Sequence, residues 1–222
     1  MKINTLYAAG LLLLSANAGA HALWVEPVDG AVHVCFGEYG ENLREKTGGT
    51  LDKITDLEVI ELPQSTTGQL GFTRQVDYLL LTKNAEALSD KQAVAIRAGK
   101  SKVRDSKDPK IGMVKPMQYA RFAMSDTEPA STLVLDIQPV AKNTFKLNFN
   151  GKPLAKTVVT VIAPNQWQRE LKTNEAGEVT FNKPWKGLYV IEASYLEQVK
   201  GEYEGQKYDA VRHASTLSVR QE

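Results

Sequence analysis

Three histidines, at positions 21, 33 and 213, are the residues of this sequence best suited to bind a metal ion. Imidazole is the commonest protein ligand for transition metals. His21 directly follows the segment "SANAGA", whose Ala18-Gly19-Ala20 is typical of a signal-peptide cleavage site. Cleavage there would free the α-amine of His21. The amine and the imidazole Nδ1 could then chelate one ion together.

The other two histidines are candidates to complete such a site. His213 stands in the closing segment "AVRHAST" and would approach His21 if the last strand lay beside the first. The resulting set of nitrogen ligands would suit Cu(II). His33 faces Glu26 if Asp29-Gly30 forms a two-residue hairpin turn. It then lies roughly 15 Å along the sheet from His21, so it can join the same ion only if the first segment bends away.

A group of acidic residues offers oxygen ligands. Glu38, Glu41 and Glu45 follow Gly37 closely. They could bind a metal directly, Glu38 first among them, or orient an imidazole by accepting its N–H. The alternative is that they form a solvated acidic face.

Sulfur ligands are a weaker possibility. Cys35 would share a strand face with His33, but a lone cysteine is more often a small buried residue. Met113, Met117 and Met124 lie within twelve residues of one another. Thioethers suit Cu(I), whereas the alternative is flexible filling of a core.

The first twenty residues predict export. Lys2 precedes a short apolar run, Ala8 to Leu14, which is far too short to span a bilayer. We therefore expect a signal peptide over 1–20 and a periplasmic protein that has no membrane insertion after cleavage. Cleavage after Ala18 is the alternative. Cys35 is the only cysteine, so an exported chain has no intramolecular disulfide.

Composition excludes several partners and reactions. The 27 Lys and Arg nearly balance the 26 Asp and Glu, which argues against nucleic acid or an anionic membrane surface as the main partner. The sequence lacks the G-x-S-x-G and H-E-x-x-H patterns, so nothing supports hydrolysis. Trp24, Trp167 and Trp185 raise the alternative of stacking on sugar rings.

The elements that must position these residues are predicted to be strands. Short β-branched and aromatic runs are separated by turn signals such as Asn150-Gly151 and Ala176-Gly177. The segment 117–125 is compatible with strand or helix, and "NAEALSD" at 84–90 with a short helix. We predict an all-β fold with two Ig-like or transthyretin-like antiparallel β-sandwich lobes, over 21–130 and 131–222. Val161, Trp185, Tyr189 and Ile191 should be at least partly buried.

The second lobe resembles a known module. The stretches "GKPLAKTVVTVIAP" and "LKTNEAGEVTFNKPWKGLYVIEASY" are similar to the carboxypeptidase regulatory-like or transthyretin-like domains. The match rests on the turn Thr173–Gly177 and on the strand that Gly187-Leu188-Tyr189 begins. This resemblance implies a β-sandwich and no particular chemistry.

The chain from His21 onward resembles a wider group, the exported bacterial proteins called domain of unknown function 4198. The matching stretches are "AHALWVEP", "VHVCFGEYGENLREKTGGTLDKI" and "YDAVRHASTLSV". Some members are regarded as periplasmic components of nickel or cobalt uptake. Many carry histidine where this chain has Glu38, so the chain departs from the group there.

Three classes of function follow. The first is a periplasmic transition-metal (copper, nickel or cobalt) binding protein, accessory to metal uptake or homeostasis, whose protein partner would be a membrane metal transporter. The second is a non-catalytic interaction or carbohydrate-binding module, and the third is a copper-dependent oxidative enzyme. We favour the first, which is not an enzyme. Protons compete for imidazole, so metal binding should weaken as the pH falls through about 6.5.

Overall fold

A computed structural model describes residues 21–222 except 65–66, 100 and 131–132. The predicted signal peptide, 1–20, lies outside the described residues. Strands dominate, and the helices of the described part are two short 3-10 helices, η1 (Tyr39–Glu41) and η2 (Thr50–Lys53). The all-β prediction is confirmed.

The strands form three main sheets and one separate hairpin. The first sheet consists of β1 (Ala22–Val28), β2 (Ala31–Glu38), β3 (Leu43–Arg44), β5 (Leu70–Arg74), β6 (Leu79–Lys83) and β7 (Glu86–Ala87). The central sheet consists of β4 (Glu58–Leu62), β8 (Ala93–Ala98), β9 (Arg104–Asp105), β10 (Met113–Ala123), β14 (Val158–Ile162), β15 (Gln168–Lys172), β17 (Gly187–Glu197) and β20 (Ala210–Gln221). The third sheet consists of β11 (Leu135–Ala141), β12 (Thr144–Phe149), β13 (Lys152–Pro153) and β16 (Glu178–Thr180). The hairpin consists of β18 (Gly201–Tyr203) and β19 (Gln206–Tyr208).

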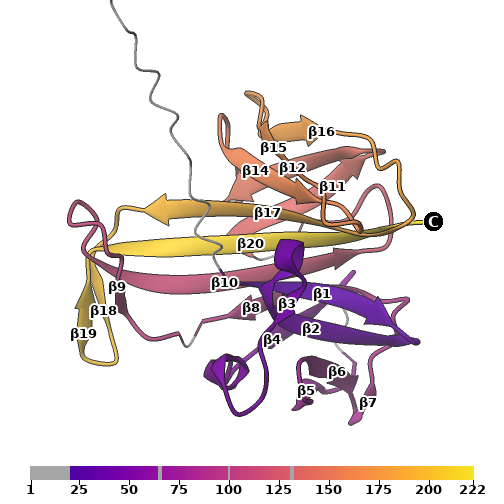
Figure 1. Cartoon of the computed structure of the whole chain (residues 1–222), viewed down its shortest axis with the longest axis horizontal. Coiled ribbons are helices and arrows are strands. Elements are labelled where there is room, and N and C mark those ends of the chain that lie inside the picture. Colours follow the sequence, from indigo (N-terminus) through magenta and orange to yellow (C-terminus); the bar gives the residue numbers. More distant parts are fainter. Residues whose placement is uncertain (1–20, 65–66, 100, 131–132) are drawn as a thin grey trace, which may run out of the picture.

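The three sheets are stacked as layers (Figure 1). The long strands β10, β17 and β20 cross the middle of the molecule, with the first sheet on one side and the third sheet on the other. Side chains alternate between the two faces of a strand. On β10, Ala120 and Phe122 join a core with the first sheet, whereas Tyr119 and Ala123 join a core with the third. Two sandwiches therefore share one central sheet.

The central sheet takes strands from both sides of the predicted boundary at 130/131. β10 pairs in parallel with β20, from Val114 opposite Ala210 to Ala123 opposite Val219. Parallel neighbours need a long connection, and here the connection contains the whole third sheet. Both halves of the chain thus contribute strands to one sheet. The domain boundary at 130/131 stays a prediction.

The edge of β1 that is free of β2 lies on the face of the central sheet. Polar side chains of the central sheet form hydrogen bonds with the backbone groups along this edge. Without these bonds the backbone groups would be buried and unpaired. The bonds are Thr216 Oγ1 to Leu23 O (2.7 Å), Ser218 Oγ accepting from Val25 N (3.3 Å), Arg220 to Pro27 O (2.6 Å) and Gln118 Nε2 to His21 O (3.1 Å). Buried hydroxyls on β20 thus position the strand that follows His21.

The predictions for single segments and residues are confirmed in some cases and wrong in others. Asp29 and Gly30 have φ of +50° and +82°, and His33 pairs with Glu26, so the predicted hairpin is confirmed. The segment 117–125 lies mostly in β10. The short helix expected at 84–90 is wrong, because β7 forms there and pairs with β6. Val161, Tyr189 and Ile191 are buried, whereas Trp185 is 40% exposed.

Candidate functional site

His21 lies between two carboxylates at the start of β1. Its Nδ1 is 3.4 Å from Glu38 Oε1, and its Nε2 is 2.5 Å from Glu45 Oε1. Glu38 is held opposite by the β1–β2 pairing, and Glu45 is placed by its own backbone N–H, which donates to Phe36 O. The His21 ring packs on Phe36, with ring centroids 5.6 Å apart.

The two contacts of the His21 ring are chemically unequal. A neutral imidazole has one N–H, so it can donate to only one carboxylate. The contact at Nε2 is the closer of the two, and the hydrogen bond with His21 lowers the pKa of Glu45. Nδ1 faces Glu38 at 3.4 Å, where it can donate to the carboxylate if it carries a proton or present its lone pair if it does not.

A third acidic residue, Glu192, lies near Glu38. Glu192 stands on β17, opposite Thr216 of β20. Burial, with a further contribution from the charge of Glu38, raises the pKa of Glu192 to about 7. Glu41, the remaining acidic residue predicted near His21, is exposed on η1. Glu38 and Glu45 thus make the surroundings of His21 favourable for a cation.

The side chains alone do not form a metal centre. Within the described ranges, no group of three or more His, Cys, Asp or Glu side chains is placed to hold a metal ion. The reason is visible at His21, where the two carboxylates approach opposite ring nitrogens and do not converge on one point.

His213 is not brought to His21. Its side chain is 4% exposed and lies in the layer between the central and third sheets, against Tyr119 and Phe149. Tyr119 Oη is 3.0 Å from Nδ1 and Glu197 Oε2 is 3.2 Å from Nε2, so both ring nitrogens have partners. His21 packs on the opposite face of the central sheet. The expected His21–His213 pair is therefore wrong. β1 packs on one face of β20, and the side chain of His213 points to the opposite face.

His33 is also separate from His21. Its ring stacks on Tyr78, with centroids 3.8 Å apart and planes inclined by 11°. Burial lowers its pKa, partly opposed by the charge of Glu26. Since β1 and β2 stay paired from Ala22 to Val28, the first segment does not bend His33 towards His21.

The neighbour of His33 is a buried carboxylate with a full set of partners. Glu26 accepts from Trp24 Nε1 at 2.8 Å and from Arg44 at 2.8 and 2.9 Å. Cys35 Sγ lies 3.8 Å from the same carboxylate, and burial raises the pKa of the Cys35 thiol. A neutral, buried thiol is a poor metal ligand, so the structure favours packing for Cys35.

The methionines do not cluster. Met113 opens β10 and Met124 follows its last residue, a separation of roughly 36 Å at strand rise. Met113 and Met124 are exposed, and Met117 packs against the core of the third sheet. No single Cu(I) ion could use all three.

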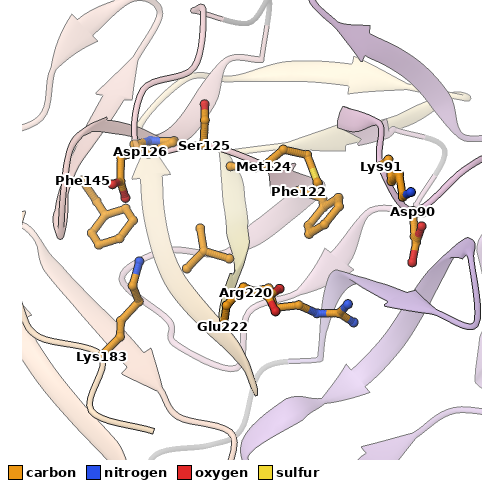
Figure 2. A pocket seen from close by; sticks show the side chains of 13 residues that line it. Asp90, Lys91, Phe122, Met124, Ser125, Asp126, Phe145, Lys183, Arg220 and Glu222 are labelled. Carbon is orange, nitrogen blue, oxygen red and sulfur yellow. The ribbon is translucent and has the colours of Figure 1, made fainter. Parts of the chain in front are cut away.

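A cavity of about 440 Å³ lies at the C-terminal ends of β10 and β20 (Figure 2). Lys183 reaches towards Phe145, with Nζ 5.4 Å from the ring centroid, and burial lowers its pKa. The charged groups of the lining are three cations and three acids: Lys91, Lys183, Arg220, Asp90, Asp126 and Glu222. With both signs equally present, the lining selects neither an anion nor a cation.

Two exposed tryptophans form a second surface feature. Trp167 and Trp185 are 49% and 40% exposed, and their ring centroids are 5.9 Å apart at an angle of 57°. The turn before Trp167 is closed by a bond from Ala163 N to Trp167 O, and Trp185 N donates to Tyr189 Oη. The pair is therefore held by ordered backbone. Trp24, in contrast, is buried.

Sequence reasoning missed two polar residues near His21. Gln118 bonds the His21 carbonyl from β10, and Glu192 on β17 interacts with Glu38. A signal was present for both, because each interrupts a mostly apolar strand segment, "MQYARFA" and "YVIEASY". Their common target could not be read from the sequence, since they lie 74 or more residues apart from each other and from His21.

Comparison with protein-family models finds no match, and comparisons with curated proteins and with solved structures find none either. The resemblance to domain of unknown function 4198 stays a prediction. In the described part of the chain, no helix has the length and apolar character needed to cross a membrane. The fold and the site together define an all-β protein that holds an imidazole between two carboxylates at the start of its first described strand.

Proposed function

We propose that the protein is exported, begins at His21 after processing, and binds a transition-metal ion (copper, nickel or cobalt) at that residue. The ligands would be the α-amine and Nδ1 of His21 and a carboxylate oxygen of Glu38. The observation that carries the proposal is the 3.4 Å separation of Nδ1 from Glu38 Oε1. Two ligands at ~2.1 Å from one ion, at a near-tetrahedral angle, stand roughly this far apart.

Glu45 supports the same assignment as an orienting group. Histidine ligands commonly donate their second ring N–H to a carboxylate, which fixes the tautomer and raises ligand basicity. The 2.5 Å contact at Nε2 is of that kind and leaves Nδ1 as the metal-facing nitrogen. In this arrangement neither His33 nor His213 is a ligand.

The test is a metal titration of exported protein whose start at His21 has been checked by intact mass. Cu(II) and Ni(II) binding is measured by calorimetry. His21→Ala should lose at least about 100-fold in affinity, and Glu38→Gln and Glu45→Gln about 10-fold or more each. Acetylation of the α-amine should have an effect as large as His21→Ala, because the acetylated nitrogen has no lone pair to offer an ion.

His213→Gln is the matched control, since it removes an imidazole that already has two partners. Its affinity should equal that of the wild type. Equal binding by the wild type and His21→Ala, or a mature chain that begins at Gly19, would overturn the proposal.

A second candidate function rests on Trp167 and Trp185. Exposed indole faces stack on sugar rings, and this pair is both exposed and fixed. The probe is a panel of soluble polysaccharides, with tryptophan fluorescence as the readout. Trp167→Ala and Trp185→Ala should each abolish a saturable change, whereas Trp24→Phe should preserve it. A panel without any saturable response rejects this candidate.

A further inference from the structure

Gln118 carries one of the two buried side-chain polar atoms without a hydrogen-bond partner among the described residues. Gln118 is only 8% exposed, and no donor forms a hydrogen bond with its Oε1. The other orphan is Ser215 Oγ. A buried acceptor without a donor destabilises the folded state by about 1–3 kcal/mol. A donor placed near Oε1 would remove this cost.

The orientation of this amide is set by His21. Gln118 Nε2 is 3.1 Å from the His21 carbonyl oxygen. Only the amide nitrogen can donate to a carbonyl, so Oε1 is the atom left over. The two atoms belong to one small amide group, which places Oε1 beside the backbone of His21.

The backbone nitrogen of His21 is on the same side of β1 as its carbonyl. Along β1 the groups that face the central sheet are Leu23 O, Val25 N and Pro27 O, together with His21 O. In an extended strand the N–H and C=O of one residue point to the same edge. The nitrogen of His21 therefore faces the central sheet, where Gln118 stands.

We propose that Gln118 Oε1 is the acceptor for the α-amine of a chain that begins at His21. In an unprocessed chain that nitrogen carries one hydrogen, fixed by a peptide plane, and it does not bond Oε1. Cleavage gives the nitrogen two or three hydrogens and frees their direction. Gln118 then forms two hydrogen bonds with His21: its Nε2 donates to the carbonyl, and its Oε1 accepts from the amine. Glu38, which faces the His21 ring, places a carboxylate near the new terminus.

This inference rests on the start at His21 that the metal proposal also needs, and it concerns the protein without metal. Gln118 is a positioning residue, since it would hold the amine through a hydrogen bond and leave a lone pair free for an ion. It predicts that processing completes the packing of β1, so that the mature terminus is more protected than a terminus displaced by one residue.

The experiment compares four exported proteins in the presence of a chelator: wild type, a chain with one glycine inserted after Ala20, Gln118→Leu, and both changes together. The first readout is the rate at which a small acylating reagent modifies the α-amine, measured by peptide mass. We expect a rate at least about fivefold lower in the wild type than in the other three. The second is the thermal midpoint, which the glycine should lower by about 2–6 °C in the wild type.

In the Gln118→Leu background, the glycine should cause no further loss, because the acceptor is already gone. Ser215→Ala is the matched control, since it removes the other orphan, and the glycine should destabilise it as much as it destabilises the wild type. Equal acylation rates in wild type and Gln118→Leu, additive thermal shifts, or a mature mass that starts elsewhere would overturn the inference. Loss of metal binding with protection intact would instead overturn the metal proposal alone.

Discussion

At the scale of single residues, identical side chains have different roles because their neighbours differ. His21 has a close contact with Glu45 and a longer one with Glu38, whereas both ring nitrogens of His213 have partners in a buried layer. Tyr119 donates to Nδ1 of His213, and burial raises the pKa of Tyr119, so it remains a neutral donor. Nε2–H then donates to Glu197. This chain of bonds suits a neutral imidazole.

His213 should make stability depend on pH. Burial lowers its pKa below 6.5, and the hydrogen bond with Glu197 opposes this only in part. The folded state therefore holds fewer protons than the unfolded state just below pH 6.5. Stability is complete above that value and falls as the pH drops, by up to ~1.4 kcal/mol per pH unit from this group.

The measurement is urea unfolding of wild type and His213→Gln from pH 7.5 to 5. The variant keeps polar atoms without titrating, so its decline with falling pH should be shallower than that of the wild type. His33→Gln provides a comparison at a less buried site and should change the slope less. Parallel curves for wild type and His213→Gln would contradict the assignment.

At the scale of elements, β1 is held by hydroxyl groups on the face of another sheet. Strand edges are usually paired or covered, and here Thr216 and Ser218, both fully buried, cover the free edge. Polar residues in the middle of β20 would be costly in a purely apolar layer. Their bonds to β1 explain why they are present.

Thr216→Val should destabilise the protein by about 1–3 kcal/mol, because it leaves the Leu23 carbonyl buried without a donor while keeping the side-chain shape. Denaturant unfolding gives the loss, and hydrogen exchange should locate it as faster exchange of β1 amides. Thr180→Val is the control. Thr180 also bonds through its hydroxyl, to Thr144, but is exposed, so the loss should stay below about 0.5 kcal/mol. Equal losses would argue against this role of Thr216 at the edge of β1.

At the scale of the whole molecule, a buried ion pair ties the central sheet to the third. Arg121 of β10 is 0% exposed and donates to both carboxylate oxygens of Asp136 on β11, each at 3.1 Å. It also donates to Pro129 O. The ion pair with Asp136 crosses the predicted boundary at 130/131, so the two sandwiches should unfold together.

Arg121→Met should cost about 3–5 kcal/mol, because it leaves the buried carboxylate of Asp136 without its main cation. The double variant Arg121→Met, Asp136→Leu should recover much of that loss, since it removes both charges. Calorimetry should show one transition for the wild type. Two separate transitions would mean that the sandwiches are independent, and a harmless Arg121→Met would mean that the pair is not buried in solution.

Some features of this protein follow from local sequence. Alternation and turn chemistry predict the strands and the Asp29-Gly30 hairpin, because side-chain direction in a strand and positive φ in a turn are properties of a few adjacent residues. They also predict that Glu26 faces His33. For the same reason, the carboxylates that follow Gly37 were recognisable as neighbours of one another.

The contents of the candidate site depend on the tertiary structure. His21 meets Glu38 through strand pairing, Glu45 through the return of the chain after η1, and Gln118 through the docking of β1 on the central sheet. His213 was expected there and lies on the other side of that sheet. Sequence tells which residues alternate along β20, but the face that β1 covers is set by the packing of whole sheets, which no local pattern encodes.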